Sequence, residues 1–106
     1  MRRKMGFRYI LGWLIAGTRG GITRGRIIRA LKTSPFNANQ LTNLLNLDYR
    51  TTRHHLDVLL KNKLIIIKGE GYGQKYYLSN VLEDNYLMFE DFFNRIWEKQ
   101  KRKKNK

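Results

Sequence analysis

The sequence has no cysteine, one proline, and only 8 acidic residues against 22 lysines and arginines among its 106 residues. Without cysteine, a disulfide framework, a thiolate zinc site and cysteine redox chemistry are all excluded. The longest apolar stretch, Phe7 to Ala16, is interrupted by Arg8. It is also far shorter than the roughly 20 residues that span a bilayer. We therefore expect a cytoplasmic protein that does not insert into a membrane.

The remaining composition predicts one domain with a strong attraction for polyanions. A chain of this length with 42% hydrophobic residues can bury a single core. The net charge of +14 favours nucleic acid or an anionic membrane surface as partner. Residues 18–79 carry a net charge of +8 and residues 80–98 a net charge of −4. We expect residues 18–79 to bind the anionic partner and the acidic segment 80–98 to have another role. Residues 99–106 are expected to be a solvated basic tail.

The first apolar segment predicts a packing helix over 6–17. A secretory signal peptide is the alternative, but such a segment seldom contains an arginine. Tyr9 and Trp13 widen the apolar arc, so two faces of this helix need to be covered. The apolar residues at helical spacing are Phe7, Ile10, Leu11, Leu14 and Ile15.

Helix signals continue in the middle of the chain. Thr23 is placed to cap a helix that begins at Arg24, and Ser34-Pro35 is expected to end it. Asn37 is placed to cap a second helix, with Gln40 at the capping-box position. The residues of this second helix that we expect to point inward are Leu41, Leu44 and Leu45.

A third helix and a hairpin follow. Asn46 tolerates a left-handed turn, and Asp48 is placed to cap a helix from about Tyr49 to Lys61. Residues 64–67 and 75–78 are predicted to form two strands joined by the glycine-rich turn 69–73. The predicted fold class is therefore mainly α with a small β-hairpin (α+β). More finely, it is a winged helix-turn-helix core over 23–79 with additional N- and C-terminal helices.

The third helix has an apolar face and a basic face. Thr52, Leu56 and Leu59 share one face and are expected to hold the helix in place. The opposite face, whose arginines can bond guanine bidentately, is the predicted contact with bases in the major groove. A solvated basic face is the alternative. The predicted recognition-helix residues are Tyr49, Arg50, Thr51, Arg53, His54 and Asp57.

Two residues of this helix have more than one interpretation. Asp57 can accept from cytosine or, four residues after Arg53, orient that side chain. His54 and His55 diverge by 100° on a helix, and no other ligand completes a metal site around them. We therefore predict no metal, no cofactor and no catalytic site, and expect His55 to be a packed, hydrogen-bonded histidine.

The hairpin tip is the second predicted DNA contact. Its glycines allow a close approach to a backbone, and the polar residues beside them can donate to phosphates or enter a minor groove. A plain solvent-exposed turn is the alternative. The predicted wing residues are Lys68, Tyr72, Gln74 and Lys75.

The acidic segment predicts a dimerisation helix over 80–98, capped by Asn80. Its apolar residues follow a heptad-like spacing of 4, 3, 4 and 3, and its acidic side would be repelled by phosphates. Covering its own domain is the alternative to a two-fold dimer. Together with the N-terminal helix, the predicted interface comprises Ile10, Leu11, Leu14, Leu82, Tyr86, Phe89, Phe93, Ile96 and Trp97.

The stretch from Asn37 to Leu64 resembles the ArsR-like transcriptional regulators, especially archaeal members. The matching positions are Leu47, Thr51, His55-Leu56 and Leu59, with Leu64-Ile65 opening the wing. The resemblance implies sequence-specific duplex DNA binding by a homodimer, often as a repressor. Lys63 departs from the pattern, which has a glycine at the end of the recognition helix. The lack of cysteine means that the thiolate metal sensing of some members is not implied.

The predicted function is thus a DNA-binding transcriptional regulator, with double-stranded DNA and a second copy of the chain as partners. Whether a small-molecule effector acts on it is left open by the sequence. A winged-helix interaction module of a larger machine is one alternative. Binding of RNA through Tyr72, Tyr76 and Tyr77 is another. An enzyme is not predicted, because no nucleophile and base are paired in the sequence.

Overall fold

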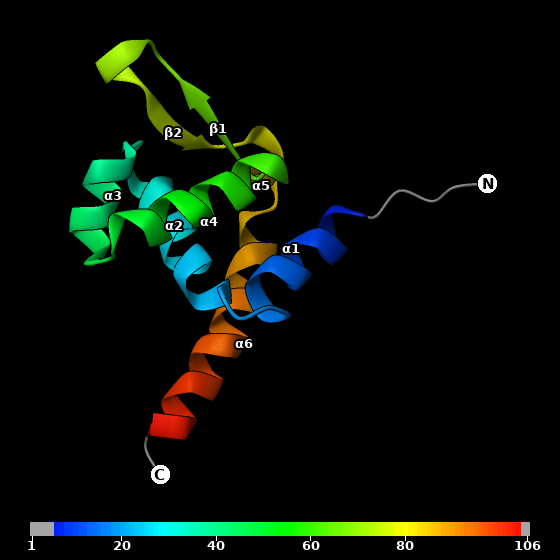
Figure 1. The fold of residues 1–106 in the computed structure, drawn as a ribbon. Coiled ribbons are helices and arrows are strands. Elements are labelled where there is room, and N and C mark those ends of the chain that lie inside the picture. Colours follow the sequence, from blue (N-terminus) through cyan, green and yellow to red (C-terminus); the bar gives the residue numbers. More distant parts are fainter. Residues whose placement is uncertain (1–5, 105–106) are drawn as a thin grey trace.

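The computed structural model describes residues 6–104, which form a mainly helical fold with one two-stranded antiparallel sheet (Figure 1). The coarse fold class predicted from the sequence is confirmed. The elements, in chain order, are α1 (Phe7–Ala16), α2 (Gly21–Thr33), α3 (Ala38–Leu45), α4 (Tyr49–Lys61), β1 (Ile65–Lys68), a short 3-10 turn (Gly71–Gly73), β2 (Lys75–Leu78), α5 (Asn80–Asp84) and α6 (Tyr86–Lys104).

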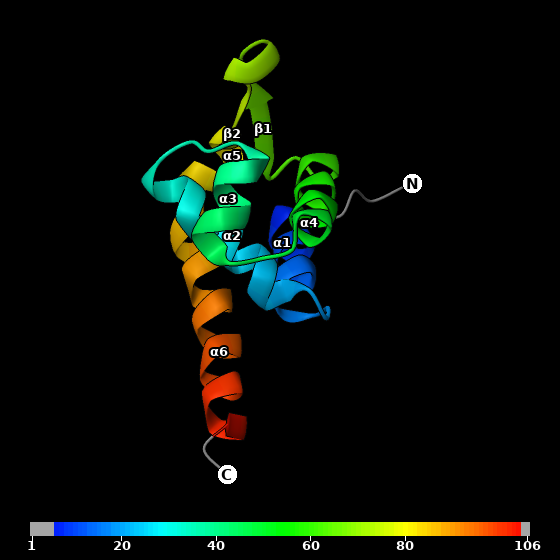
Figure 2. The same cartoon turned by 60° about the vertical axis from the view of Figure 1, so that its left-hand side comes forward.

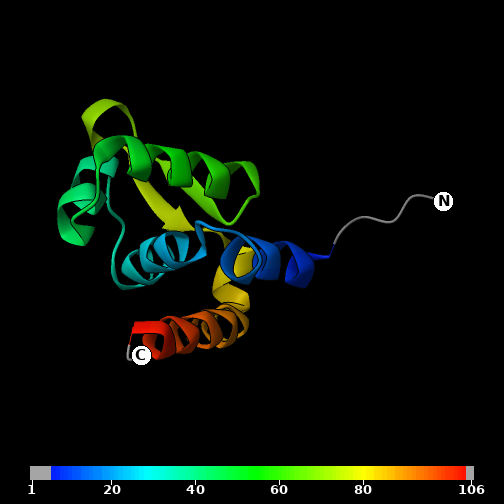
Figure 3. The same ribbon diagram turned by 60° about the horizontal axis from the view of Figure 1, so that its bottom comes forward.

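The core lies around α2, which packs between α4 on one side and α6 on the other (Figure 3). α1 lies against both α2 and α6, and the base of the hairpin closes the core near α2 and α4. The hairpin projects from one end of the molecule and the C-terminal end of α6 from the opposite end (Figures 1 and 2). The largest fully buried side chains are Phe89, Phe93, Leu11, Ile15, Ile27, Ile28, Leu41, Leu56, Leu59, Leu64, Ile65 and Leu82.

The predicted caps of α3 and α4 are confirmed. The Gln40 amide donates to the Asn37 side chain and the Asn37 amide to the Gln40 side chain, both at 2.8 Å. Asp48 accepts from the Thr51 amide at 3.3 Å, and Asn46 ends α3 in the left-handed conformation, with φ 54°. Because these contacts join residues no more than three positions apart, local sequence predicts them well. Leu44, in contrast, is exposed rather than buried.

α2 begins at Gly21, not at Arg24, so the predicted Thr23 cap is wrong. The reason is tertiary packing. A Cβ atom on Gly21 would lie 1.7 Å from the Ile15 carbonyl oxygen, and one on Gly25 would lie 2.1 Å from the Phe93 ring. Glycine at these two positions therefore lets α2 approach α1 and α6 closely. The helix begins at Gly21, so that both glycines lie within it.

The C-terminal segment forms two helices rather than one. Ser79, not Asn80, caps α5 by accepting from the Leu82 amide at 3.3 Å, and Asn85 separates α5 from α6. α6 then continues to Lys104. The predicted helix end at residue 98 is thus wrong, whereas Lys99, Lys101 and Arg102 are exposed to solvent, as predicted for the basic tail. Lysine, arginine and glutamine are good helix formers, and cations stabilise a helix C-terminus.

The hairpin is short and is tied to the helices at its base. β1 pairs with β2 in the register Ile65↔Leu78 to Lys68↔Lys75. The tip turns through Gly69 and Gly71, which have φ values of 103° and 51°. Beyond the hairpin itself, the Tyr76 amide donates to the Phe36 carbonyl at 2.8 Å. This bond fixes β2 against the segment that joins α2 to α3.

Candidate nucleic-acid interface

α4 is held in place by the face that the sequence assigns to the core. Thr52, Leu56 and Leu59 are all fully buried. The Thr42 hydroxyl of α3 donates to the Thr52 hydroxyl at 2.9 Å, so the two helices are joined by a hydrogen bond as well as by packing. The connection between them is only Asn46 to Asp48. The orientation of α4 relative to α3 is therefore well determined.

The opposite face of α4 is open to solvent. Five of the six predicted recognition residues are exposed, and Thr51 is half-buried. The exposed residues are Tyr49, Arg50, Arg53, His54 and Asp57. The exposure of Arg50 and Arg53 is what contact with a DNA groove requires.

Arg53 connects α4 to the hairpin. Its Nη1 donates to the Tyr76 hydroxyl at 2.9 Å, and its Nη2 lies 3.9 Å from the Asp57 carboxylate, four residues later. The interpretation that Asp57 orients Arg53 fits this geometry. The Tyr76 contact joins positions 23 residues apart and has no signal in the local sequence.

The hairpin tip and the start of α4 border the same hollow. Lys68, Tyr72 and Gln74 are exposed, and Lys75 is half-buried. A hollow of about 190 Å³ is lined by Tyr49 and Arg53 of α4 and by Tyr72 and Gln74 of the hairpin, among other residues. Two residues from each set that the sequence assigned to DNA contact therefore border one hollow, whereas Lys68 lines a different hollow, beside α2 and α5.

Other basic residues of the middle segment are used inside the molecule. Arg24 is 5% exposed and forms no ion pair with an acidic residue in the described part of the chain. Its Nε and Nη2 donate to the Leu14 carbonyl at 3.0 and 2.9 Å, Nη2 also donates to the Thr18 hydroxyl, and Nη1 lies 3.1 Å from His55 Nδ1. Arg26 donates to the Leu45 carbonyl at 2.7 Å. These two charges stabilise helix ends rather than meeting an external anion.

His55 is the packed, hydrogen-bonded histidine that was predicted. It is 7% exposed and contacts Arg24. Burial, reinforced by the nearby charges of Arg24 and His54, lowers the pKa of His55 to about 4. At neutral pH the imidazole is therefore neutral, and its Nδ1 accepts from Arg24. Burial likewise lowers the pKa of the Arg24 guanidinium below its usual value.

The acidic segment pairs with the outer side of α2. Lys32 Nζ lies 2.6 Å from the Glu83 carboxylate, and Arg29 Nε lies 3.6 Å from that of Glu90. The Arg29 guanidinium also lies over the Phe93 ring. The other role that was expected for these acids is thus intramolecular, at least for Glu83 and Glu90.

The basic end of α6 is not part of the α4–hairpin surface. α6 carries Lys99, Lys101 and Arg102 toward the end of the molecule opposite the hairpin (Figures 1 and 2). The exposed basic side chains are thus spread over several regions, which include the α4–hairpin surface, the outer side of α2 and the far end of α6.

Most of the predicted dimer residues are buried within the single chain. Side chains in the core of their own chain cannot contact a partner. The predicted dimer interface is therefore wrong for these residues. The physical reason is that one apolar stripe looks the same whether it packs in its own domain or across a dimer. The buried residues are Leu11, Leu14, Leu82, Phe89 and Phe93; Ile10, Tyr86 and Ile96 are half-buried, and Trp97 is exposed.

A different apolar surface remains open on α1. Tyr9 and Trp13 are 59% and 55% exposed, and they border an open groove of about 660 Å³ that Phe92 of α6 completes. The sequence indicated that α1 has two faces to cover, but it did not place Tyr9, Trp13 or Phe92 in an interface. The spacing of these aromatic residues along their helices is the sequence feature that could have indicated this surface.

In residues 6–104, no group of three or more acidic, histidine or cysteine side chains is arranged to hold a metal ion. Within the same residues, every helix is too short or too polar to cross a membrane. In comparisons with known proteins, no family model and no curated sequence matches this chain.

Proposed function

We propose that the protein is a sequence-specific, double-stranded DNA-binding regulator of transcription with a winged helix-turn-helix fold. The observation that carries this proposal is the shared surface of α4 and the hairpin. Tyr49 and Arg53 border the same hollow as Tyr72 and Gln74, and Arg50 and His54 are exposed on the same helix. An exposed basic helix beside a projecting hairpin is the arrangement with which such domains bind a duplex.

In this proposal α4 enters the major groove by its N-terminal half. Arg50 donates to a guanine edge, while His54 and Thr51 contact neighbouring bases or phosphates. Lys68, Tyr72, Gln74 and Lys75 of the wing contact the adjacent backbone or minor groove. Arg53 is held between Asp57 and Tyr76, and so keeps the two contact regions in a fixed relation.

We further propose that two copies associate through the open groove on α1. Tyr9, Trp13 and Phe92 give an apolar area that remains uncovered in the single chain. Closed two-fold dimers are the commonest soluble oligomers. A two-fold pair with its two α4 helices about 34 Å apart would bind an inverted repeat, with half-sites one helical turn apart.

Selection of binding sites from random duplex DNA tests this function. We expect enrichment of an inverted repeat and an affinity that falls steeply with salt, because bound phosphates release counterions. Failure to enrich any sequence would overturn sequence-specific binding. Equal competition by RNA of the same length would point instead to an RNA-binding protein.

A further inference from the structure

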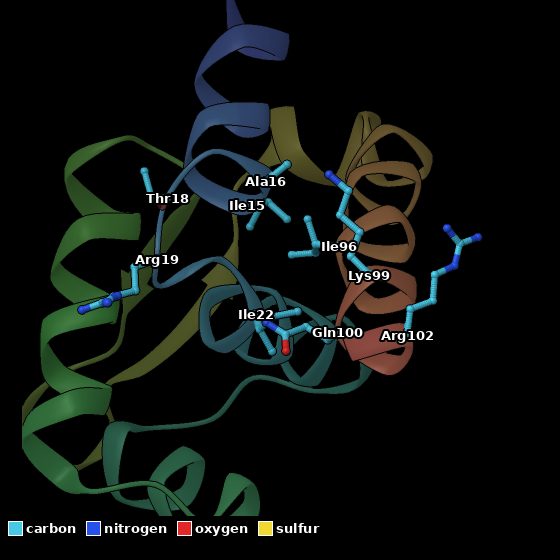
Figure 4. A pocket seen from close by; sticks show the side chains of 9 residues that line it. All are labelled: Ile15, Ala16, Thr18, Arg19, Ile22, Ile96, Lys99, Gln100 and Arg102. Atoms are coloured by element: carbon cyan, nitrogen blue, oxygen red, sulfur yellow. The ribbon is translucent and has the colours of Figure 1, made fainter. Parts of the chain in front are cut away.

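A second pocket borders the C-terminal end of α1, next to the Tyr9 and Trp13 groove, with which it shares Ala16. It has a volume of about 440 Å³ and lies where the end of α1, the loop 17–20, the start of α2 and the last turns of α6 meet (Figure 4). Its size is within the range of pockets that bind small organic molecules. It is remote from the α4–hairpin hollow and shares no lining residue with it.

The floor of this pocket is aliphatic. The side chains of Ile15, Ile22 and Ile96 converge on its centre from three different helices (Figure 4). Ile15 is buried, and Ile22 and Ile96 are half-buried. An apolar group of a ligand would cover the exposed part of these side chains, and burial of apolar area favours binding.

The charged side chains that line this pocket are all basic. Lys99 extends along the rim on the α1 side, and the longer Arg19 and Arg102 start at the rim and point away from the centre (Figure 4). No acidic side chain of the described chain lines the pocket. The charge at the mouth therefore favours an anionic group and disfavours a cationic one.

One wall of the pocket is connected to α4. Thr18 lines the pocket, and its hydroxyl accepts from the buried Arg24. Arg24 in turn contacts His55 on α4. The neighbouring Gly20 packs so closely that a Cβ atom there would lie 2.5 Å from both Arg24 and His55. A shift of the loop 17–20 would therefore alter the contacts that hold α4.

We propose that this pocket binds a small organic anion with an aliphatic body, such as a medium-chain carboxylate, and that its occupancy alters the Thr18–Arg24–His55 contacts. The isoleucine floor takes the aliphatic body, and Lys99 attracts the carboxylate. Any effect on duplex binding rests on the function proposed above, but binding to the pocket and the change at His55 do not.

Titration of the full chain with octanoate, followed by amide and imidazole NMR signals, tests the proposal without DNA. We expect saturable shifts at Ile15, Ile22 and Ile96, accompanied by shifts of the His55 imidazole. Octylammonium, of the same chain length and opposite charge, should bind at least about tenfold more weakly because it is repelled at the rim. Absence of DNA binding in a separate assay would leave these results unaffected.

A pair of variants tests the role of the rim. Lys99→Glu should weaken octanoate binding about fivefold to tenfold, since it replaces an attraction with a repulsion at an exposed site. Arg95→Glu makes the same change of charge on α6, at an exposed side chain that lines none of the pockets described, and should change octanoate binding less than twofold. Circular dichroism of both variants checks that α6 is intact.

Five results would overturn the proposal. Four of them are shifts confined to Tyr9 and Trp13, equal binding of octylammonium, equal affinity of Lys99→Glu and the parent chain, and an unchanged His55 signal at saturation. Concentration-dependent shifts at Ile22 and Ile96 without octanoate would also overturn it, because a second copy of the chain would then cover the pocket.

Discussion

Arg24 Nη1 lies 3.1 Å from His55 Nδ1, and this contact joins the start of α2 to the buried side of α4. Arg24 also binds the Leu14 carbonyl at the end of α1. One guanidinium thus joins three helices. Because it is buried and has no acidic partner among residues 6–104, its charge is stabilised by the Leu14 carbonyl, the Thr18 hydroxyl and a neutral imidazole.

The first prediction concerns acid stability. The pKa of His55 is about 4 in the folded protein, below the value of about 6.5 that we expect when the chain is unfolded. The unfolded chain therefore binds more protons between these values, and stability is lost as pH falls from about 6.5 to about 4. The loss amounts to at most about 3 kcal/mol.

Urea unfolding at pH 7.5, 5.5 and 4.5 measures this loss. His55→Gln should flatten the pH dependence over this range, because glutamine cannot take up a proton. His54→Gln, at the exposed neighbouring position, is the matched control and should keep the slope. An unchanged slope in His55→Gln would show that other groups cause the loss of stability.

The second prediction concerns base recognition. Arg50→Ala should reduce the discrimination between a selected site and a scrambled duplex by about 1–3 kcal/mol, as expected for loss of one bidentate guanine contact. The measurement is a pair of duplex titrations at one salt concentration. Arg95→Ala removes the same charge from an exposed position on α6 and should leave discrimination unchanged. Equal discrimination by Arg50→Ala and the parent chain would remove Arg50 from the proposed base contacts.

The third prediction concerns the connection between α4 and the hairpin. Tyr76→Phe removes the hydroxyl that accepts from Arg53 and leaves the buried ring in place. Because Arg53 is exposed, water can replace the lost partner, and unfolding free energy should fall by no more than about 1 kcal/mol. Duplex affinity should fall more than stability does, since Arg53 loses the hydrogen bond that holds it against the hairpin.

Tyr77→Phe, at the neighbouring position on β2, provides the control. The Tyr77 ring lies under the Lys68 ammonium, a contact that survives loss of the hydroxyl. Its duplex affinity should match that of the parent chain. If Tyr76→Phe also binds the duplex with parental affinity, the Arg53 contact has no role in binding.

The fourth prediction concerns the end of α4. Lys63 adopts the left-handed conformation, with φ 61°, which costs a residue with a side chain about 1–2 kcal/mol. Lys63→Gly should therefore raise the free energy of unfolding by about 1 kcal/mol. Lys61→Gly, two residues earlier at the last residue of α4, should lower it, because glycine is a poor helix former. Urea unfolding of both variants decides whether the two signs are opposite.

The fifth prediction concerns association. Trp13→Ala should weaken self-association measured by light scattering over a range of concentrations, because Trp13 borders the open α1 groove. Leu87→Ala removes an even more exposed side chain, at 84%, outside this groove, and should leave self-association unchanged. If Leu87→Ala alone disrupts the dimer, the interface lies at the start of α6.

The sequence predicted the features that depend on neighbouring residues. The box of Asn37 and Gln40, the Asp48 cap and the left-handed Asn46 each involve side chains within a few positions of one another. The two strands and the exposed face of α4 follow from periodicity in the same way.

The features that sequence reasoning missed depend on contacts between distant segments. The early start of α2 arises from Gly21 packing on Ile15, and the Arg24 contact with His55 joins positions 31 residues apart. The apolar stripe of α6 gave no means of telling a core from an interface. Phe89 and Phe93 lie in the core because α1 and α2 of the same chain pack against α6.

The Phe93 ring occupies the recess that Gly25 leaves on α2. α6 cannot slide along α2 without moving this ring out of the recess, so the Phe93–Gly25 contact, together with packing against α1, sets the direction of the helix. From Phe93 to Lys104, at 1.5 Å per residue, the helix extends about 16 Å further. A small change in the tilt of α6 at Phe93 therefore produces a larger displacement at the C-terminal end of the helix.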